Sequence, residues 1–440
     1  MKPSFHVGHD NAGTPVFSKT LSCFIQYTIP KNDCGILREL AKHYAELAAN
    51  PVNRERMFRT KKTNDLIHDR PIVWIEEIPW HELNIDDQLT LRCDSEEGRV
   101  LEEFFRQTLF RWKYFQADMV VEDTLYILKS YSNSGIGIDV KEETLSLPGN
   151  NAIVSHRYED QLDCEEKIER LSPPVIKAHS ENDRQNLEIC SEIFNGILPV
   201  KLRGHYVDYS PWEHIAEFRG VDKVLNDIID NPELLHVTMK KFSELGNAFF
   251  DQFEAEGLLD YNIQKVHCTP GYTNILPAKD YKDGLVRFKD TWLRTRAQMF
   301  SMVSPSMRDE FDLQYIRPFM DRSGIVYYGC CEPLELCMPY LKQIPNLRKI
   351  GASPWANIST LAEQIGGDYV LARKPNPATV ATVLNEETVS KEITETVEAC
   401  IKNKCPYEFV FKDISTVGCK PENLFSWIRI VNQILDKYYT

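Results

Sequence analysis

The sequence predicts an α/β fold: a TIM (β/α)8 barrel preceded by a helical N-terminal extension. Two observations lead to this prediction. Eight short apolar runs that suit buried strands recur along the 440 residues, and amphipathic helical patterns lie between them. Strands of such a barrel are buried on both faces, so their apolar runs need not alternate with polar residues.

The elements follow one another in a regular order. Residues 1–65 form the predicted extension, helical around "GILRELAKHYAELAANP", and residues 66–440 form the predicted barrel. The apolar runs that we assign to its strands are 70–77, 119–128, 197–204, 257–263, 324–330, 347–353, 368–374 and 407–415. The segment 129–180 is rich in Gly, Pro and Ser, which predicts an irregular excursion between the second and third strands.

Two of the connecting helices can be read in detail. In the segment 230–257, Asn231 stands at the N-cap and Pro232 at the first helical position, and an apolar stripe follows at helical spacing. The segment 98–118 carries a similar stripe and joins the first two strands. Both helices are therefore predicted to pack on the outside of the sheet.

Composition excludes several classes of protein. The formal charge of −14, with no large block of Lys and Arg, argues against a nucleic-acid partner. The sequence contains no run of 18 uncharged apolar residues that would predict a membrane span, and its first residues lack the features of a signal peptide. We therefore expect a cytoplasmic protein. Twelve cysteines are too dilute for a disulfide scaffold.

The ends of the predicted strands are where a TIM barrel places its chemistry. Three of the segments there contain Pro-Trp, which supplies the tryptophans Trp80, Trp212 and Trp355. Their broad amphipathic rings would suit a pocket for a small apolar or aromatic ligand, or they could simply cover the end of the barrel.

Possible metal ligands occur at the same ends. Cys330 and Cys331 are adjacent in "YYGCCEPLELC", Cys419 follows the last strand, and His267 follows the fourth. Thiolates and imidazoles are ligands of catalytic zinc sites that keep one position open. No CxxC pair is present, so spacing alone does not distinguish such a site from small core cysteines.

Other strand-end residues allow more than one interpretation. His205 could act as a ligand or base, or could be a hydrogen-bonded structural residue, and Arg373 with Lys374 could hold an anionic group or be solvated. Glu76 and Glu77 could be a paired acid and base, or could point to opposite faces. The sequence contains no G-x-S-x-G, G-x-G-x-x-G or Walker-type motif.

Several segments together resemble the uroporphyrinogen decarboxylase superfamily. They are "RPIVWI", "EDTLYI", "EFRGVDKVLNDIIDNPELLH", "SPWANISTLAEQIGGDYVLARKPNPA" and "DISTVGCKPENLFSWIRI", spread in the right order over residues 65 to 437. The resemblance implies a TIM barrel. The true decarboxylases carry an arginine-bearing "RQAGR" after the first strand, whereas this chain has "EEIPW", whose Glu76 and Glu77 would repel a polyanionic porphyrinogen.

The chain is more similar to the cobamide-dependent methyltransferases of that superfamily. Their zinc motif is His-x-Cys followed much later by Gly-Cys, and Cys331 or Cys330 matches the first cysteine while Cys419 matches the second. Tyr328 or the glycine after it stands where the family has its histidine. The resemblance therefore implies a zinc site in which His267 or Glu332 replaces that ligand, or one that holds the metal differently.

The activity that the resemblance implies is a zinc-dependent, O-demethylating methyl transfer between a small methoxylated substrate and a corrinoid, a cobalamin-type cofactor, carried by a partner protein. Glu332 or Asp413 could donate a proton, and Asp123 matches a substrate-binding aspartate of the decarboxylases. The candidate substrate-binding residues are Trp80, His205, Trp212, Tyr328, Trp355 and Arg373. The alternatives are a metal-independent decarboxylase or lyase using Arg373, Asp123 and His205, and a non-catalytic ligand-binding barrel.

Overall fold

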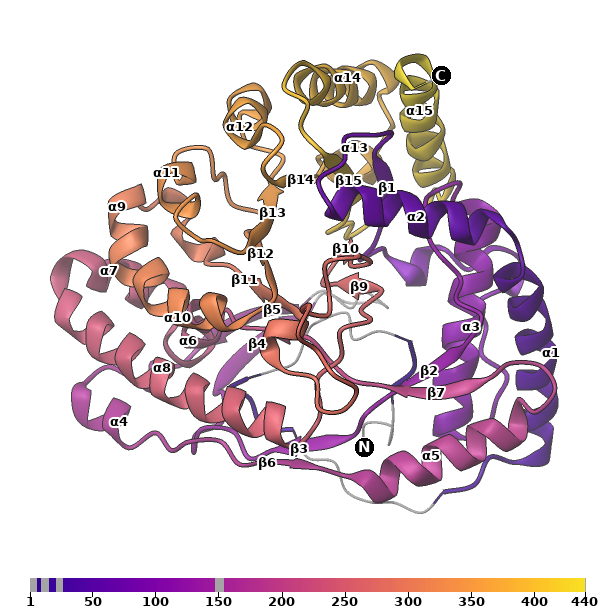
Figure 1. Cartoon of the computed structure of the whole chain (residues 1–440), viewed down its shortest axis with the longest axis horizontal. Coiled ribbons are helices and arrows are strands. Elements are labelled where there is room, and N and C mark those ends of the chain that lie inside the picture. The colour runs from indigo at the N-terminus through magenta and orange to yellow at the C-terminus, as the bar shows by residue number, and fades with distance from the viewer. Residues whose placement is uncertain (1–5, 9–15, 21–26, 147–153, 440) are drawn as a thin grey trace.

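The computed structural model describes residues 6–8, 16–20, 27–146 and 154–439 (Figure 1). Its centre is a curled sheet of seven parallel strands in the order β1-β15-β14-β13-β12-β11-β8. These strands are β1 (Ile72–Ile75), β8 (Val207–Asp208), β11 (Trp292–Thr295), β12 (Ile325–Tyr328), β13 (Leu347–Ala352), β14 (Val370–Arg373) and β15 (Tyr407–Phe411). The parallel strands confirm the predicted α/β class.

Two further strands extend the wall. β2 (Leu125–Leu128) pairs in parallel with β7 (Val200–Arg203), and the chain runs from β7 directly into β8, which pairs with β11. Eight successive wall positions are therefore occupied. The described strands form no ladder between β1 and β2, so the barrel stays open at one seam, where Val7 bridges to Ile127 on the free edge of β2.

The predicted fourth strand, 257–263, is wrong. Only Leu259 bridges to a neighbour, His205, because Asp260 turns the chain by accepting hydrogen bonds from the backbone of Gly204 and Asn262. The fourth wall strand is β11 instead. Only two of its four residues, Trp292 and Leu293, are apolar, so it forms no apolar run.

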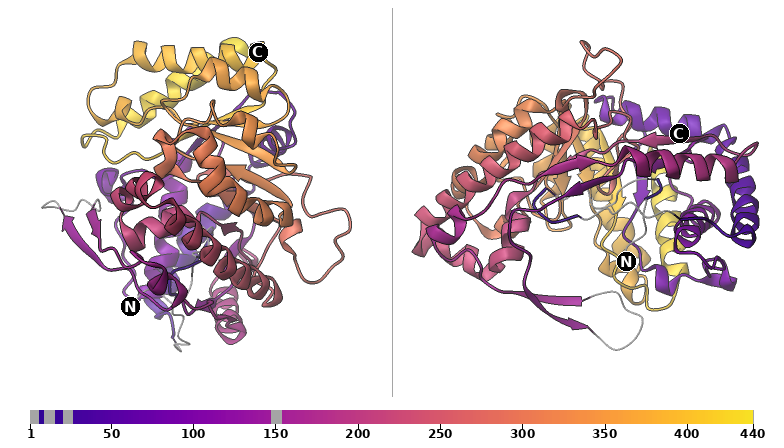
Figure 2. Two further views of the ribbon diagram at one scale, coloured as in Figure 1. Left: turned by 90° about the vertical axis from the view of Figure 1, so that its left-hand side faces the viewer. Right: turned by 90° about the horizontal axis from the view of Figure 1, so that it is seen from below.

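Helices cover the outside of the sheet, and α8 packs the predicted apolar stripe of 230–257 into the main core (Figures 1 and 2). The helices are α1 (Lys31–Ala48), α2 (Val52–Asn64), α3 (Glu96–Tyr114), α4 (Glu165–Glu169), α5 (Ser180–Ile193), α6 (Pro211–Arg219), α7 (Val221–Asp230), α8 (Pro232–Ala255), α9 (Pro305–Arg308), α10 (Gln314–Arg322), α11 (Met338–Leu341), α12 (Ile358–Ile365), α13 (Ala378–Ala381), α14 (Glu386–Lys402) and α15 (Glu422–Tyr438). No helix in the described ranges is both long and apolar enough to cross a bilayer.

The excursion 129–180 is built largely from two antiparallel pairs. They are β3 (Tyr131–Asn133) with β6 (Ile176–Ala178), and β4 (Glu142–Ser146) with β5 (Val154–Tyr158). The β4–β5 pair projects from the body of the molecule (Figure 2).

A short hairpin fills the inside of the barrel. Its strands, β9 (Lys265–Val266) and β10 (Thr269–Pro270), lie within the ring of wall strands in Figure 1. Lys349 of β13 donates to the Thr269 hydroxyl (3.2 Å) and the Pro270 carbonyl (3.1 Å), and the indole of Trp292 donates to the Gly271 carbonyl (2.9 Å). The hairpin tip, His267–Cys268, is thereby held toward the carboxyl ends of the strands.

Candidate active site

Backbone strain gathers at the carboxyl end of the barrel. Glu77 after β1, His267 at the hairpin tip and Asp413 after β15 all have positive φ angles of 49°, 53° and 57°. A non-glycine residue in this region costs on the order of 1 kcal/mol or more, and such residues cluster at functional sites. All three side chains point into one group of polar and sulfur atoms.

The centre of this group is Cys330. Its Sγ lies 3.6 Å from Cys331 Sγ, 3.8 Å from His267 Nε2 and 3.5 Å from Lys412 Nζ. Lys412 Nζ is also 3.3 Å from His267 Nε2. Cys330 and Lys412 are buried, so their contacts are shielded from water. We call Cys330, Cys331, His267 and Lys412 the Cys330 cluster.

Two carboxylates border the Cys330 cluster. Glu77 accepts from Lys412 at 3.0 Å, and Asp413 lies 3.3 Å from the same ammonium. Cys331 donates to Asp413 at 3.2 Å. The side chains of Glu77 and Asp413 are 34% and 49% exposed, so the cluster opens to solvent on their side.

The cluster changes the acidity of its members. The hydrogen bond between Cys330 and Cys331, with the charges of Lys374 and Lys412 acting against burial, holds the pKa of Cys330 well below its usual range. That same hydrogen bond, together with burial, raises the pKa of Cys331. Burial would lower the pKa of His267, but the charge of Cys268 and its hydrogen bonds raise it to about 9. The site therefore favours a thiolate at Cys330 beside cationic partners.

The position of Cys330 is fixed from behind. Its backbone N–H donates to the fully buried carboxylate of Glu332 at 2.8 Å, and Arg308 lies 3.6 Å from the other oxygen of that carboxylate. Glu332, predicted as a proton donor or ligand, thus reaches the cluster through the backbone of Cys330.

Zinc can be tested against this donor set. Zinc–sulfur and zinc–nitrogen bonds of about 2.3 and 2.0 Å place ligand atoms of a tetrahedral site roughly 3.5 to 3.8 Å apart, which the Cys330 contacts approach. However, the Lys412 ammonium occupies the space between Cys330 and His267, and Cys419 is exposed, with its backbone bound to Glu82. Within the described ranges, no group of three or more His, Cys, Asp or Glu side chains could hold a metal ion. The arrangement does not fit zinc.

A pocket lies at the open seam of the barrel and reaches Glu76, the neighbour of Glu77 in the chain. It has a volume of about 490 Å³, and Trp80, Glu76, Arg111 and Lys265 line it. Glu76 pairs with Arg111 (3.0 Å) and Lys265 (3.2 Å). Burial would raise the pKa of Glu76, but these two charges lower it to about 2. Trp80 therefore lines this pocket.

The other predicted substrate contacts lie elsewhere. Trp212 donates to the Phe311 carbonyl and Tyr328 to Asp312, both inside the core between sheet and helices. Trp355 is 73% exposed, and Arg373 pairs with Glu392 of α14. The structure does not bring these four side chains to the Cys330 cluster.

The remaining predicted residues, His205 and Asp123, also lie away from the Cys330 cluster. His205 contacts the Lys129 carbonyl through Nε2 (2.8 Å) and packs against Tyr131 and Phe253. Asp123 precedes β2 and therefore lies at the amino-terminal end of the barrel.

Sequence reasoning named Lys374 beside Arg373 but missed the other lysines of the interior. Lys265, Lys349, Lys374 and Lys412 are all buried. A signal was available, because Lys412 directly follows the apolar run "YEFVF" and Lys349 lies within another run. Lysine is rarely buried without a partner, so a lysine inside a buried strand predicts an interior charge network.

Comparison with known proteins gives a likeness among solved structures but none among family models or curated proteins. Among solved structures, a methyltransferase from Methanosarcina mazei aligns with a TM-score of 0.47 at 10% identity, over 88% of this chain and 99% of that chain.

Proposed function

We propose that this protein transfers a methyl group from a small methylated compound, and that the Cys330 cluster is its reaction centre. The observation that carries the proposal is a buried, acidified thiol held 3.5 Å from a buried ammonium at the carboxyl end of a barrel-like sheet. The sequence resemblance to cobamide-dependent methyltransferases supports the same chemistry.

The residues present suit the demands of methyl transfer. Displacement at a methyl carbon requires that the departing oxygen or nitrogen be protonated or otherwise stabilised. Lys412 can stabilise the departing atom with the charge of its ammonium, and Glu77 and Asp413, both partly exposed, can bring a proton from solvent. Trp80 and the seam pocket provide a surface for the body of a small substrate.

The methyl acceptor that we propose is a corrinoid bound to a partner protein, as the resemblance implies. A corrinoid supplies a strongly nucleophilic cobalt for the methyl group. The exposed side of the cluster at Glu77 and Asp413 is where such a partner would have to approach.

A decarboxylase is less well supported. That alternative used Arg373, Asp123 and His205 together. Arg373 is tied to Glu392 beside α14, Asp123 lies at the amino-terminal end of the barrel, and His205 is tied to Lys129. The three residues do not share a site.

The test is a direct transfer assay. Methoxylated aromatic compounds and chemically reduced free cobalamin are incubated with the protein, and methylcobalamin is followed by absorbance. We expect Cys330→Ser and Lys412→Met to lower the rate by about 100-fold or more, while Cys164→Ser, a change at an exposed cysteine, does not. Release of carbon dioxide from carboxylated compounds, or full transfer activity in both variants, would contradict the proposal.

A further inference from the structure

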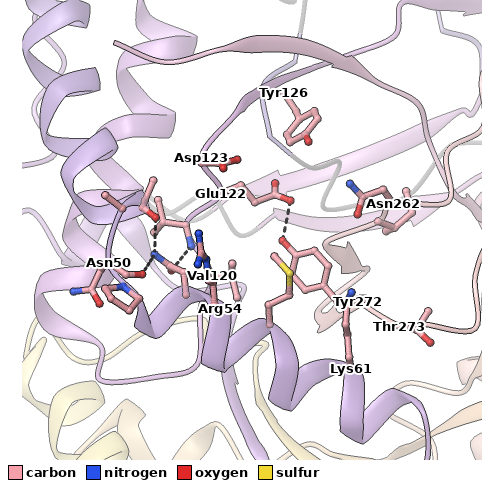
Figure 3. Close-up of a pocket in the computed structure, with 18 of the residues that line it drawn as sticks. Asn50, Arg54, Lys61, Val120, Glu122, Asp123, Tyr126, Asn262, Tyr272 and Thr273 are labelled. Carbon is pink, nitrogen blue, oxygen red and sulfur yellow. Dashed lines mark hydrogen bonds between the residues drawn. The ribbon is translucent and has the colours of Figure 1, made fainter.

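A second cavity lies at the amino-terminal end of the barrel, away from the Cys330 cluster (Figure 3). Its volume is about 670 Å³, within the range of about 300 to 1,000 Å³ that small-molecule sites occupy. Helix α2, the segment before β2 and the two ends of the interior hairpin form its walls. None of its lining residues belongs to the Cys330 cluster, and it meets the seam pocket at Val120, Val121, Glu122 and Tyr126, which line both.

One wall of this cavity is cationic. Arg54, Met57 and Lys61 of α2 are three and four residues apart, so they share one face of the helix and line the cavity together. Within the described ranges, the side chains of Arg54 and Lys61 form no hydrogen bond or ion pair. Both charges are therefore available to a ligand.

The facing wall is aromatic and mostly neutral. Tyr126, Tyr261 and Tyr272 line it (Figure 3 shows Tyr126 and Tyr272). The carboxylate of Glu122 is balanced, because Arg203 binds both of its oxygens at 2.9 Å and the Tyr272 hydroxyl donates to it at 2.8 Å.

Polar side chains complete the rim. Asn262 and Thr273 offer further hydrogen-bonding groups. Asp123 is exposed on the same wall as Glu122 and accepts from the neighbouring Thr124 hydroxyl. Its charge opposes an anion in the cavity, but Arg54 and Lys61 together outweigh it.

We propose that this cavity is a second ligand site that takes a small organic anion with a flat aromatic body. The anionic group would pair with Arg54 and Lys61, and the ring would pack against the tyrosines. Such a ligand would also contact Ile263 and Gly271, which flank the hairpin that carries His267. The proposal goes beyond methyl transfer and does not depend on it.

The test is isothermal titration of the whole chain with 4-hydroxybenzoate and with 4-hydroxybenzyl alcohol, its neutral counterpart. We expect the carboxylate to bind in a saturable way and the alcohol to bind about tenfold more weakly, because a charge-assisted hydrogen bond is worth about 1.5 to 3 kcal/mol. Equal affinities, or no saturable binding of the carboxylate below about 10 mM, would overturn the proposal.

Variants locate the site. Arg54→Gln/Lys61→Gln should weaken 4-hydroxybenzoate binding by about tenfold or more. Lys240→Gln/Lys437→Gln, which removes the same charge from exposed positions elsewhere, should leave it unchanged. Asp123→Asn should tighten binding by about twofold, because it removes a repelling charge. Unchanged affinity in the first variant, or weakened binding in Asp123→Asn, would show that the anion does not bind in this cavity.

Discussion

The two ends of the barrel interior are built differently. At the carboxyl end, sulfur, ammonium, imidazole and carboxylate groups form hydrogen bonds and ion pairs with one another. At the amino-terminal end, the walls stand apart around a cavity, and Arg54 and Lys61 face it without partners in the described ranges. The charged groups of the carboxyl end are already paired with one another, whereas the amino-terminal end has an open cavity and unpaired cations. The first suits chemistry on a bound group, and the second suits reversible binding.

The largest effect on stability is expected when one charge of a buried ion pair in the barrel interior is removed. Lys349 pairs with Glu408 at 2.8 Å, and both are fully buried. Lys349→Met leaves the carboxylate of Glu408 unpaired and should lower the free energy of unfolding by about 3 to 5 kcal/mol. Urea denaturation measures this loss. Lys349→Met/Glu408→Gln should recover much of it, and equal losses in both variants would mean that burial of the charge is not the cause.

The second effect depends on pH. The pKa of Glu76 is lowered to about 2 against an ordinary value of 4.5, so its ion pairs stabilise the fold by roughly 3 kcal/mol above pH 4.5 and lose this effect as the pH falls toward 2. Lys265→Met should therefore destabilise the protein at pH 7, and the difference from the original protein should shrink toward pH 4 and below. Urea denaturation between pH 7 and pH 2 checks this. If the difference in free energy of unfolding between the variant and the original protein stayed constant with pH, the ionisation of Glu76 would not be its cause.

A smaller effect separates cavity wall from core. Met57 borders the amino-terminal cavity and is only partly buried, whereas Met239 of α8 is fully buried in the main core. Met57→Ala should lower the free energy of unfolding by less than about 1 kcal/mol, and Met239→Ala by about 2 to 5 kcal/mol. Thermal or urea unfolding of the two variants gives the comparison. Equal losses in the free energy of unfolding would show that Met57 is buried in solution and closes the cavity.

The smallest effect sharpens the description of the carboxyl end. Because Lys412 supplies the positive charge beside Cys330, prolonged treatment with 1,10-phenanthroline should leave the transfer rate within about twofold of its starting value. Metal content of the treated protein is measured alongside by elemental analysis. Loss of activity that added zinc restores would show that Lys412 moves aside for a metal.

The sequence predicted most of the barrel wall, including strands that carry a charged residue within an apolar run. β12, β13, β14 and β15 lie within predicted runs. The run 257–263 failed because its second half, "DYNI", satisfies backbone groups through Asp260 and so needs no strand neighbour. β11 was missed because only two of its four residues, Trp292 and Leu293, are apolar, so it forms no apolar run.

The candidate site was predictable only in part. The strand-end rule brought Cys330, Cys331 and Asp413 into view, and the structure places these with His267. The rule did not distinguish residues that open into the barrel from residues that pack between the sheet and the outer helices. Trp212 was therefore included although it belongs to that outer core. Nor can chain position reveal a hairpin that passes through a barrel, because its contacts join residues far apart in sequence.

The pairing of β1 with β15 has a consequence for how the protein is made. Ile72 lies opposite Glu408, 408 − 72 = 336 residues later. At roughly 5 to 20 residues per second, the ribosome needs about 17 to 67 seconds to deliver the partner of the first wall strand. During that time one edge of β1 waits without its neighbour, as does β2 on its seam side unless residues 6–8 already bond there. The early bridge at Val7 would thus serve as a temporary guard against unwanted strand pairing while the chain is still attached.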